Sequence, residues 1–548
     1  MASASRYAPR AGTLASTACI ALAFPPVEWW PLIWFGLAPW LYALGRCRSL
    51  GEAIWQGFWL NLLLGFAAVF WVAYAVPRYL GVSVLAGVLA VCLHALVHQL
   101  QLPIFAGAWW AARRAAAPQS FVNLCGLALL YTGIDWATPK LFQDTFGLML
   151  HGSPALRQLA AIGGTPVLTF LVLLVNLGIV AIAHTFATRA REGTALRRSM
   201  AVWAAWLLLP LAACYALGAH EYARVTRAIA SPERVVQVGL VQGNVDEALR
   251  SRWARGDAEA AKASLATYLR ATNELLDAAS KPDLVVWPET SFPGIFRKPE
   301  NDAQLMLNVA FDREIAARGT PRVFGGYDRE DRRDRRVLRN ALYFVEPFPG
   351  QARHELSPMQ VYHKEILFPI GEYFPLLDEA TVRRWLPGAA HLARGEGARV
   401  YTLTLGAGES IRLGPAICYE DLFARHTAEL ANLGAELLLN VSNDSWFGDY
   451  GAARLHLIAA TFRSVETGLP QLRATNSGYS GLVLPNGEVR AATRYGESVA
   501  KTIPVPILAP QPTLRSHLGD WFGPLSLALG LLVLSPRVSE ALRLETRG

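Results

Sequence analysis

Three side chains able to do nucleophilic or acid–base chemistry stand at the ends of apolar stretches in the second half of the chain. Glu289 closes DLVVWPE, Lys364 lies in VYHKEILFPIGEYFP, and Cys418 follows GPAI. A carboxyl flanked by Trp, Pro and Phe is poorly solvated, which raises its pKa towards that of a general base. An ammonium near a cysteine stabilises both a thiolate and a tetrahedral oxyanion. Each residue also has a plain structural interpretation, as a helix cap, a surface lysine or a core cysteine.

Cys418 is set apart from the other cysteines by its surroundings. The five others lie in long apolar stretches or at their edges: Cys19, Cys47, Cys92, Cys125 and Cys214. A lone cysteine in a polar region is either a buried small hydrophobe or a reactive thiol. We expect Cys418 between a strand and a helix, where the positive end of the helix dipole favours a thiolate and backbone N–H groups can hold an oxyanion.

The composition indicates a membrane protein. Of 548 residues 53% are hydrophobic and only 17% are charged, with 17 Trp. The apolar residues gather in the runs 12–26, 31–45, 54–77, 81–108, 120–137, 161–186, 200–218 and 518–535. Several runs approach the ~20 residues that cross a bilayer as a helix. We therefore predict about eight spans: about seven in an N-terminal domain (1–218), and one in a C-terminal segment (518–548) that ends in a cytoplasmic tail.

Arginines predict how these spans are oriented. If every run crosses, alternate connections carry Arg6, Arg10, Arg46, Arg48, Arg113, Arg114, Arg189, Arg191, Arg197, Arg198 and Arg537. The intervening short loops carry only Arg78, Lys140 and Arg157. The Arg-rich side is expected in the cytoplasm. The first run could be a signal peptide, but dropping it breaks the alternation, so we interpret it as a retained helix. The polar region 219–517 then lies on the periplasmic face.

The polar region alternates strands and helices, which is typical of a layered α/β domain. Strands are expected at 235–244, 283–289, 321–328, 340–346, 400–405, 411–417, 435–443, 471–476 and 480–485, and helices at 257–279, 302–318, 420–433 and 453–467. The charged tip 329–339 is expected to be a solvated hairpin loop, with no role in binding nucleic acid. No metal-ligand spacing and no Walker-type glycine loop occur. We expect no metal and no cofactor, so side chains alone must do the chemistry.

Several motifs resemble a known superfamily. WPET (287–290), the Lys364 segment with FPIGEYFP, and AICYEDLF (416–423) resemble the Glu-Lys-Cys triad of the nitrilase (carbon–nitrogen hydrolase) superfamily. NVSNDSWFG (440–448) and RATNSGYSGLVLPNGEV (473–489) are similar to its later blocks. With many predicted spans before this domain and one after it, nearly the whole chain resembles the apolipoprotein N-acyltransferase family.

The resemblance implies an αββα nitrilase-like sandwich on the periplasmic face of a bacterial inner membrane. It implies acyl transfer from a phospholipid, through a thioester, to the α-amino group of a diacylglyceryl-modified N-terminal cysteine of an apolipoprotein. By the same resemblance Glu289 is the general base, Lys364 stabilises charge and Cys418 is the nucleophile. Supporting residues would be Glu372, Tyr419, Glu420 and, in a mobile loop, Trp253. We expect a monomer.

Two other classes of protein remain open. A membrane-anchored amidase could use the same triad, with water in place of the amine. A transporter would carry ionisable residues inside its spans, where we find mainly His94, His98 and Asp135. The two histidines share a helix face and are expected to hydrogen-bond between helices. The apolar loops 291–296 and 445–450 either touch the bilayer, act as a lid, or pack in the ordinary way.

Overall fold

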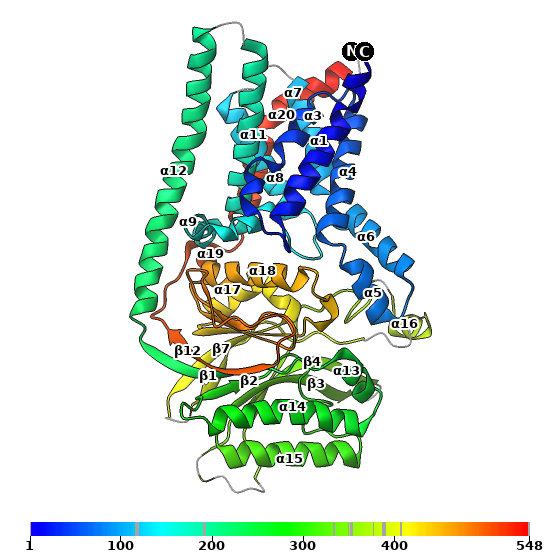
Figure 1. Ribbon diagram of the computed structural model, residues 1–548, viewed down its shortest axis with the longest axis vertical. Helices are drawn as coiled ribbons and strands as arrows, with labels where there is room; N and C mark the ends of the chain where they lie inside the picture. Colours follow the sequence, from blue (N-terminus) through cyan, green and yellow to red (C-terminus); the bar gives the residue numbers. More distant parts are fainter. Residues whose placement is uncertain are drawn as a thin grey trace.

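The chain folds into a helical bundle joined end to end with a two-sheet α/β domain (Figure 1). The computed structural model describes residues 2–114, 120–189, 193–332, 335–348, 350, 355–375, 377–385, 391–405 and 408–545. Both ends of the chain lie at the end of the bundle far from the sheets (Figure 1). Arg191, one of the arginines used to predict orientation, lies outside the described residues.

The bundle consists of helices from both ends of the sequence. They are α1 (Ala2–Ala23), η1 (Trp30–Leu32), α2 (Ile33–Gly36), α3 (Ala38–Leu44), α4 (Leu50–Ala68), α5 (Val72–Leu80), α6 (Val84–His98), α7 (Gln101–Arg114), α8 (Phe121–Ala137), η2 (Phe146–Gly152), α9 (Pro154–Arg157), α10 (Ala160–Gly163), α11 (Thr165–Arg189), α12 (Thr194–Ala230) and α20 (Phe522–Glu545). The C-terminal helix α20 packs along α8, so the last helix of the chain completes the bundle that the first ones begin.

Two helices of the described chain, Thr165–Thr188 within α11 and Thr194–Ala230, are long and apolar enough to cross a membrane. The number rises to three if the bent pair α6–α7 is one span. The predicted run 81–108 is therefore two helices, with a bend of 45° between them. Shorter apolar helices occur at Trp30–Leu44, Phe121–Ala137 and Phe522–Leu534. The count of about eight spans stays a prediction.

A buried asparagine stabilises the broken helix of the second apolar run. The helical path changes at Leu37, between α2 and α3. The Oδ1 atom of Asn176, on α11, accepts hydrogen bonds from the backbone N–H groups of Leu37 (2.8 Å) and Ala38 (3.0 Å). Its Nδ2 donates to Ile33 O at 2.9 Å. Asn176 is fully buried, so a single amide satisfies polar backbone groups that no water reaches.

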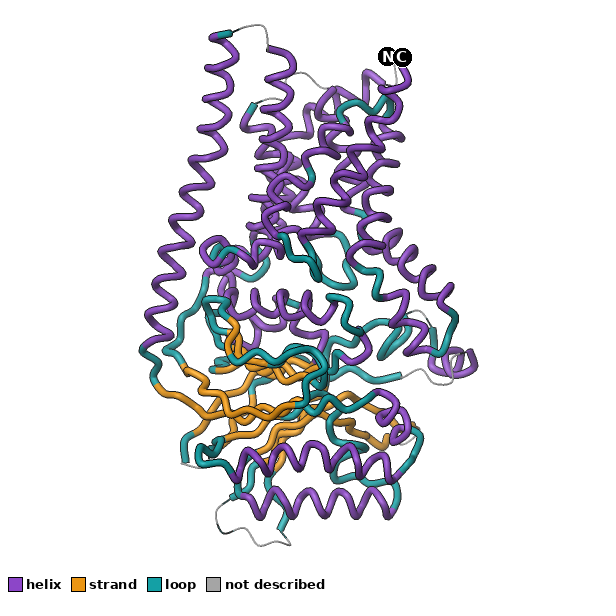
Figure 2. The backbone as a smooth tube through the Cα atoms, viewed as in Figure 1, coloured by secondary structure: helices purple, strands orange, loops and turns teal. Residues whose placement is uncertain are grey.

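Helix α12 connects the bundle to the α/β domain. At 37 residues and ~1.5 Å per residue it is roughly 55 Å long. It runs along the side of the bundle to the sheets (Figure 2) and passes residue 218, the predicted boundary, without a break. Its last turns place Val225 and Ile229 in the core between the two sheets.

Two six-stranded sheets form the α/β domain. Their strand orders are β12-β1-β2-β3-β4-β5 and β11-β10-β9-β8-β7-β6. The strands are β1 (Arg234–Gln242), β2 (Leu284–Val286), β3 (Arg322–Arg332), β4 (Arg335–Val345), β5 (Met359–His363), β6 (Tyr401–Thr404), β7 (Ser410–Ile417), β8 (Leu437–Ser442), β9 (Gln471–Thr475), β10 (Gly481–Val483), β11 (Val489–Arg490) and β12 (Val499–Ile507). Strands β2 and β8 run parallel to both of their neighbours, and β7 runs parallel to β8.

Helices cover the outer faces of both sheets, which gives the αββα layers. The helices of the domain are α13 (Glu247–Ala254), α14 (Ala258–Asp277), α15 (Asp302–Arg318), α16 (Glu379–Trp385), η3 (Cys418–Leu422), α17 (Ala424–Asn432), η4 (Ser445–Phe447), α18 (Ala452–Thr467) and α19 (Leu514–Leu518). Helices α14 and α15 lie at the free end of the molecule, while α17 and α18 lie between the sheets and the bundle (Figure 1). Strands with apolar side chains on both faces, such as LVV of β2, are buried by a sheet on one side and helices on the other.

Some predicted elements differ from the observed ones. The charged tip is largely strand: β3 and β4 pair as far as Arg332 and Arg335, and only Arg333 and Asp334 lie outside the described residues. The expected helix over 420–433 starts as a 3₁₀ turn at Cys418, and α17 begins at Ala424. The loop 291–296 is ordinary packing, because Phe292 and Phe296 are fully buried in the core under α14 and α15.

Replacing Asn176 by leucine should destabilise the bundle by about 2–4 kcal/mol, because two buried N–H groups lose their acceptor. Thermal unfolding in detergent measures the change. Thr185→Val, on the same helix, is the control: the Thr185 hydroxyl bonds only Ala181 O of its own helix, and its loss should cost under about 1 kcal/mol. Equal stability of the two variants would contradict the role given to Asn176.

Candidate active site

The three predicted reactive residues come from the same ends of the two sheets. Glu289 follows β2 and Lys364 follows β5, both of the first sheet, while Cys418 follows β7 of the second. All three are buried, with 7%, 1% and 8% of their surface exposed. Cys418 is a free thiol. The fold therefore brings one carboxyl, one ammonium and one thiol into a single buried site, where their charges act on one another.

Lys364 is held between two carboxylates. Its Nζ lies 2.8 Å from Glu372 Oε2 and 3.6 Å from Glu289 Oε1. Asn340 joins the two acids, since its Nδ2 donates to Glu289 Oε1 at 2.7 Å and to Glu372 Oε1 at 2.9 Å. The backbone N–H of Asn443 donates to the other Glu289 oxygen at 2.9 Å. These bonds fix the carboxylate of Glu289 in one orientation.

Burial and neighbouring charge determine the protonation of this group. Burial raises the pKa of Glu289, although Lys364 opposes the rise. For Lys364, burial alone would lower the pKa, but Glu372 and Glu289 outweigh it and raise the pKa above the usual value. Lys364 thus stays an ammonium, and Glu289 becomes a stronger base than an exposed glutamate.

Cys418 sits at a sharp turn with an unusual backbone. Its φ is +52°, a left-handed conformation that costs a non-glycine residue of order 1–3 kcal/mol and that clusters at functional sites. Burial raises the pKa of the thiol well above its usual value, and the charge of Glu289 adds to the rise, while Lys364 and the Ser442 hydroxyl oppose it. The expectation that a helix dipole favours a resting thiolate is wrong, because burial and the carboxylate raise the thiol pKa and the helix α17 begins only at Ala424, beyond a 3₁₀ turn.

The carboxylate of Glu420 accepts hydrogen bonds from backbone N–H groups on both sides of the site. Its Oε1 accepts hydrogen bonds from the N–H groups of Glu365 (2.6 Å) and Ile366 (3.0 Å) and from the Tyr362 hydroxyl. Its Oε2 accepts from the N–H of Ile417 at 2.6 Å. One buried carboxylate therefore ties the residue after Lys364 to the residue before Cys418, and so couples the two sheets at the point where the site forms.

Tyr419 connects the site to the bundle. Its hydroxyl donates to the carbonyl of Leu141, in the loop after α8. Its ring contacts Phe368, whose ring contacts Phe142 of the same loop, with centroid distances of 5.2 and 6.1 Å. The turn that carries the thiol is thus anchored to the part of the bundle that faces the domain.

The loop 445–450 also lies against the bundle. Trp446 and Phe447 pack on Trp71, at the start of α5, with centroid distances of 5.9 and 5.0 Å. The ring of Tyr450 stacks on Tyr74 of α5 at 5.3 Å. Three interpretations were left open for this loop: contact with the bilayer, a lid, or ordinary packing. In the structure the loop packs against α5 of the bundle.

Trp253 lies on α13, at the outer side of the site. Its indole Nε1 is buried without a hydrogen-bond partner, although the residue as a whole is partly exposed. Helix α13 reaches the site through Arg250, which donates to the Thr290 hydroxyl next to Glu289. The structure places Trp253 one turn beyond Arg250, and its own role stays a prediction.

A fully buried cluster of charges lies beside Cys418. Asp421 Oδ1 is 2.7 Å from His456 Nε2, its other oxygen pairs with Arg473, and the second ring nitrogen of His456 lies 3.4 Å from Asp444. The Ser442 hydroxyl donates to Asp444 at 2.6 Å. Burial alone would lower the pKa of His456, but the two aspartates raise it to about 9. An imidazolium thus holds the ends of β7 and β8 in register.

The sequence did not indicate Asn340 or Ser442. Asn340 faces the site because its backbone carbonyl accepts from the N–H of Lys364 at 2.9 Å, where the β4–β5 pairing ends. Strand β5 was not predicted from the sequence, so its pairing with β4, which brings Asn340 next to Lys364, could not be predicted either. Ser442 ends β8 next to β7, and the register of that parallel pair would have placed it beside Cys418.

Family comparisons match most of the chain. Residues 16–178 match the family described as apolipoprotein N-acyltransferase N-terminal domain. Residues 237–504 match the carbon–nitrogen hydrolase family. The first match covers helices of the bundle and the second covers both sheets, including the three candidate catalytic residues.

Individual proteins of known name are similar over nearly their full length. An apolipoprotein N-acyltransferase of Gloeobacter violaceus is 30% identical, over 96% of this chain and 94% of that protein. Another of Bdellovibrio bacteriovorus is 28% identical, over 94% and 90%. Among solved structures, an amidase from Nesterenkonia sp. AN1 is 17% identical, covering 52% of this chain and 99% of its own, with a TM-score of 0.32.

The protonation of Cys418 can be tested by alkylation in the absence of substrate. We expect the rate with iodoacetamide, after subtraction of the Cys418→Ala background, to rise with pH through pH 9 without a plateau, because the thiol pKa is raised. Glu289→Gln removes a negative charge and leaves Lys364, so alkylation at pH 7.5 should be about 3- to 10-fold faster, as for a drop of roughly 0.5–1 pKa unit. A slower rate in Glu289→Gln would instead mean that Glu289 deprotonates the resting thiol.

The tether made by Glu420 can be tested by an isosteric change. Glu420→Gln replaces an acceptor oxygen by a donor, which leaves one or more of the bonded N–H groups unpaired and should cost about 2 kcal/mol or more. Turnover should fall on the order of 100-fold, because the turn and the Lys364 segment no longer share a fixed spacing. Glu429→Gln, an exposed residue of α17, is the matched control. Full activity of Glu420→Gln would rule out the positioning role.

Proposed function

The chain belongs to the apolipoprotein N-acyltransferase family, and we propose that it N-acylates the α-amino group of the diacylglyceryl-modified N-terminal cysteine of apolipoproteins. The acyl donor is a phospholipid, and the acyl group passes through a thioester on Cys418. The observation that carries the proposal is a buried free thiol beside Glu289 and Lys364, at the sheet ends that face an apolar helical bundle.

The first half-reaction forms the thioester. Glu289 takes the proton of the Cys418 thiol as the sulfur attacks the carbonyl carbon of the phospholipid ester. Lys364 and backbone N–H groups of the turn at Cys418 stabilise the negative oxygen of the tetrahedral intermediate. The carbon–oxygen bond to the glycerol then breaks, and Glu289 returns the proton to the departing oxygen. A lysophospholipid leaves, and the acyl chain stays on sulfur.

The second half-reaction transfers the chain to nitrogen. The amine of the acceptor attacks the thioester carbonyl, and Glu289 takes a proton from the nitrogen. The carbon–sulfur bond breaks, the amide forms, and the sulfur regains the proton from Glu289. Glu372 touches none of the reacting atoms in this scheme. It pairs with Lys364, so the ammonium is retained while Glu289 alternates between its charged and neutral forms.

The bundle supports a lipid donor over a soluble one. Tyr419 and the loop 445–450 attach the site to the bundle, which holds it close to the depth of acyl esters. We propose a multi-pass protein of the bacterial inner membrane with about eight spans, with its α/β domain in the periplasm and acting as a monomer. An amidase that hydrolyses a small soluble substrate would use the same triad, but it would need at most one helix as an anchor.

Intact-protein mass spectrometry tests the proposal. Incubation with a phospholipid and no acceptor should add the mass of one acyl chain, which neutral hydroxylamine removes and which is absent in Cys418→Ala. A diacylglyceryl peptide with a free amine should then clear the adduct. Glu289→Gln should slow its formation at least about 1,000-fold. Release of lysophospholipid at the full turnover rate without any amine would contradict the transferase. The absence of an adduct, with Cys418 also unreactive to thiol reagents, would mean that the cysteine is not a nucleophile.

A further inference from the structure

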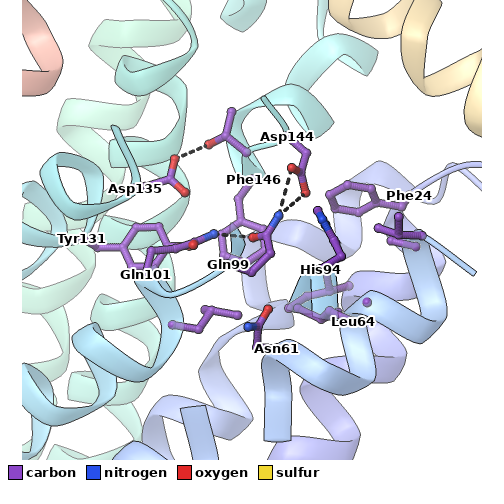
Figure 3. A pocket seen from close by; sticks show the side chains of 16 residues that line it. Phe24, Asn61, Leu64, His94, Gln99, Gln101, Tyr131, Asp135, Asp144 and Phe146 are labelled. Atoms are coloured by element: carbon purple, nitrogen blue, oxygen red, sulfur yellow. Dashed lines mark hydrogen bonds between the residues drawn. The ribbon is translucent and has the colours of Figure 1, made fainter. Parts of the chain in front are cut away.

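A small pocket lies inside the bundle, against the loop 138–145. It has a volume of about 40 Å³. Its wall is formed by α1, α4, α6, the start of α7, α8 and the loop 138–145, and most of the exposed wall is apolar. Polar side chains also reach the pocket, among them Asn61, His94, Gln99, Gln101, Asp135 and Asp144 (Figure 3). Polar groups buried among apolar helices are costly unless they are satisfied, so these groups need an explanation.

Several groups in this pocket have no partner among the described residues. Both ring nitrogens of His94 and the Oε1 atom of Gln101 are buried without a hydrogen bond. The two residues are only 5% and 4% exposed. The expectation that His94 is hydrogen-bonded between helices is wrong: its ring stacks on His98 at 5.5 Å and faces Phe142 at 5.6 Å. His94 and Gln101 thus both line the pocket with an unused acceptor, on opposite sides of Gln99 (Figure 3).

The charges of the pocket are not balanced. Asp135 pairs with Lys140 at 2.7 Å and accepts from the Thr145 hydroxyl. Asp144 receives only the Gln99 amide, 3.0 Å from each oxygen, and in the described chain it has no ion pair. The Lys140 ammonium bonds the backbone carbonyl of Asp144, not its carboxylate. The positive charge of Lys140 compensates Asp135, and the carboxylate of Asp144 is left without a compensating positive charge.

We propose that this pocket binds a primary ammonium group. Such a group carries the compensating positive charge and N–H donors, and the pocket offers the Asp144 carboxylate and a ring nitrogen of His94, while Gln101 lies beyond the Gln99 amide. An anion is excluded by Asp144, and an apolar ligand would leave the unpaired groups unsatisfied. Nothing among the described residues groups three or more His, Cys, Asp or Glu side chains as a metal would need. At roughly 10–15 Å³ for each water-sized group, the space suits one ammonium with one or two waters.

Three aromatic side chains connect the pocket with the active site. Phe142 contacts the His94 ring on one side and Phe368 on the other, at 5.6 and 6.1 Å. Phe368 in turn contacts Tyr419, the neighbour of Cys418. The loop that carries Asp144 also carries Leu141, whose carbonyl accepts the Tyr419 hydroxyl. A ligand in the pocket is therefore separated from the reacting thiol by Phe142, Phe368 and Tyr419.

This inference rests on the proposed function, which supplies the headgroup of an aminoethyl phospholipid as the primary ammonium. The α-amino group of the acceptor is not a candidate, because it must reach the thioester on Cys418. The two half-reactions test this assignment separately. The rate of thioester formation is measured with phosphatidylethanolamine and with phosphatidylglycerol of identical chains, and the KM for a diacylglyceryl peptide is measured in the second half-reaction. The variants are Asp144→Asn and His94→Phe, with Asp144→Glu as the conservative rescue.

If the headgroup binds, Asp144→Asn slows thioester formation from phosphatidylethanolamine about 10-fold or more and leaves phosphatidylglycerol within 2-fold. Normal reaction of both donors with a peptide KM raised about 10-fold or more would overturn the assignment to the headgroup. His94→Phe keeps the ring contacts and should act in the same direction by about 3-fold, and Asp144→Glu should recover part of the loss. Glu221→Gln makes the same acid-to-amide change in an exposed ion pair of α12 and should change nothing.

Equal rates for all variants would overturn the inference and leave the pocket holding only water. An equal loss with both donors and an unchanged peptide KM would also overturn it, since Asp144 would then be structural. A wild-type protein that forms no thioester refutes the proposed function instead, so the two failures are distinguishable.

Discussion

Lys364 is an ammonium with 1% of its surface exposed, and it remains charged only because Glu289 and Glu372 lie on either side of it. Removing such a cation from water costs several kcal/mol, which only close opposite charge and hydrogen bonds repay. Two carboxylates around one ammonium leave a net negative charge beside the thiol. The raised thiol pKa and the basic Glu289 follow from this grouping, and the amide of Asn340 bridges its two acids.

The positions of Glu289 and Cys418 at strand ends were predictable from the sequence, because an apolar run followed by a reactive residue marks where a buried strand leaves a sheet. Lys364 was singled out by its apolar neighbours, but the strand before it, β5, was not predicted. Their partners were harder to predict. Asn340 and Ser442 reach the site through strand pairing, and pairing depends on tertiary contacts rather than local pattern. The direction of the thiol pKa was predicted wrongly, because a local feature, the helix end, was weighed without the carboxylate that the fold brings from the other sheet.

The missed strands have physical reasons. Strand β12 contains Pro504 and Pro506, which argue against a central strand, yet it lies at the edge of its sheet, where a missing N–H is tolerated. Strand β5 is short and only partly buried. In the bundle, composition predicted where apolar helices occur but not their breaks. The break at Leu37 is stabilised by Asn176, 139 residues later in the chain, and a single sequence carries no local signal for such a contact.

The left-handed turn and the deep burial of Cys418 have a consequence for the lifetime of the protein. Oxidation to sulfenic acid, and exchange into mixed disulfides, both begin from an accessible thiolate. A thiol that is 8% exposed and has a raised pKa presents almost no accessible thiolate. The described α/β domain also contains no second cysteine that could form a disulfide with it. Under the proposed function, the carboxylate of Glu289 that takes the thiol proton during turnover also keeps the thiol protonated, and so protected from oxidation, at rest.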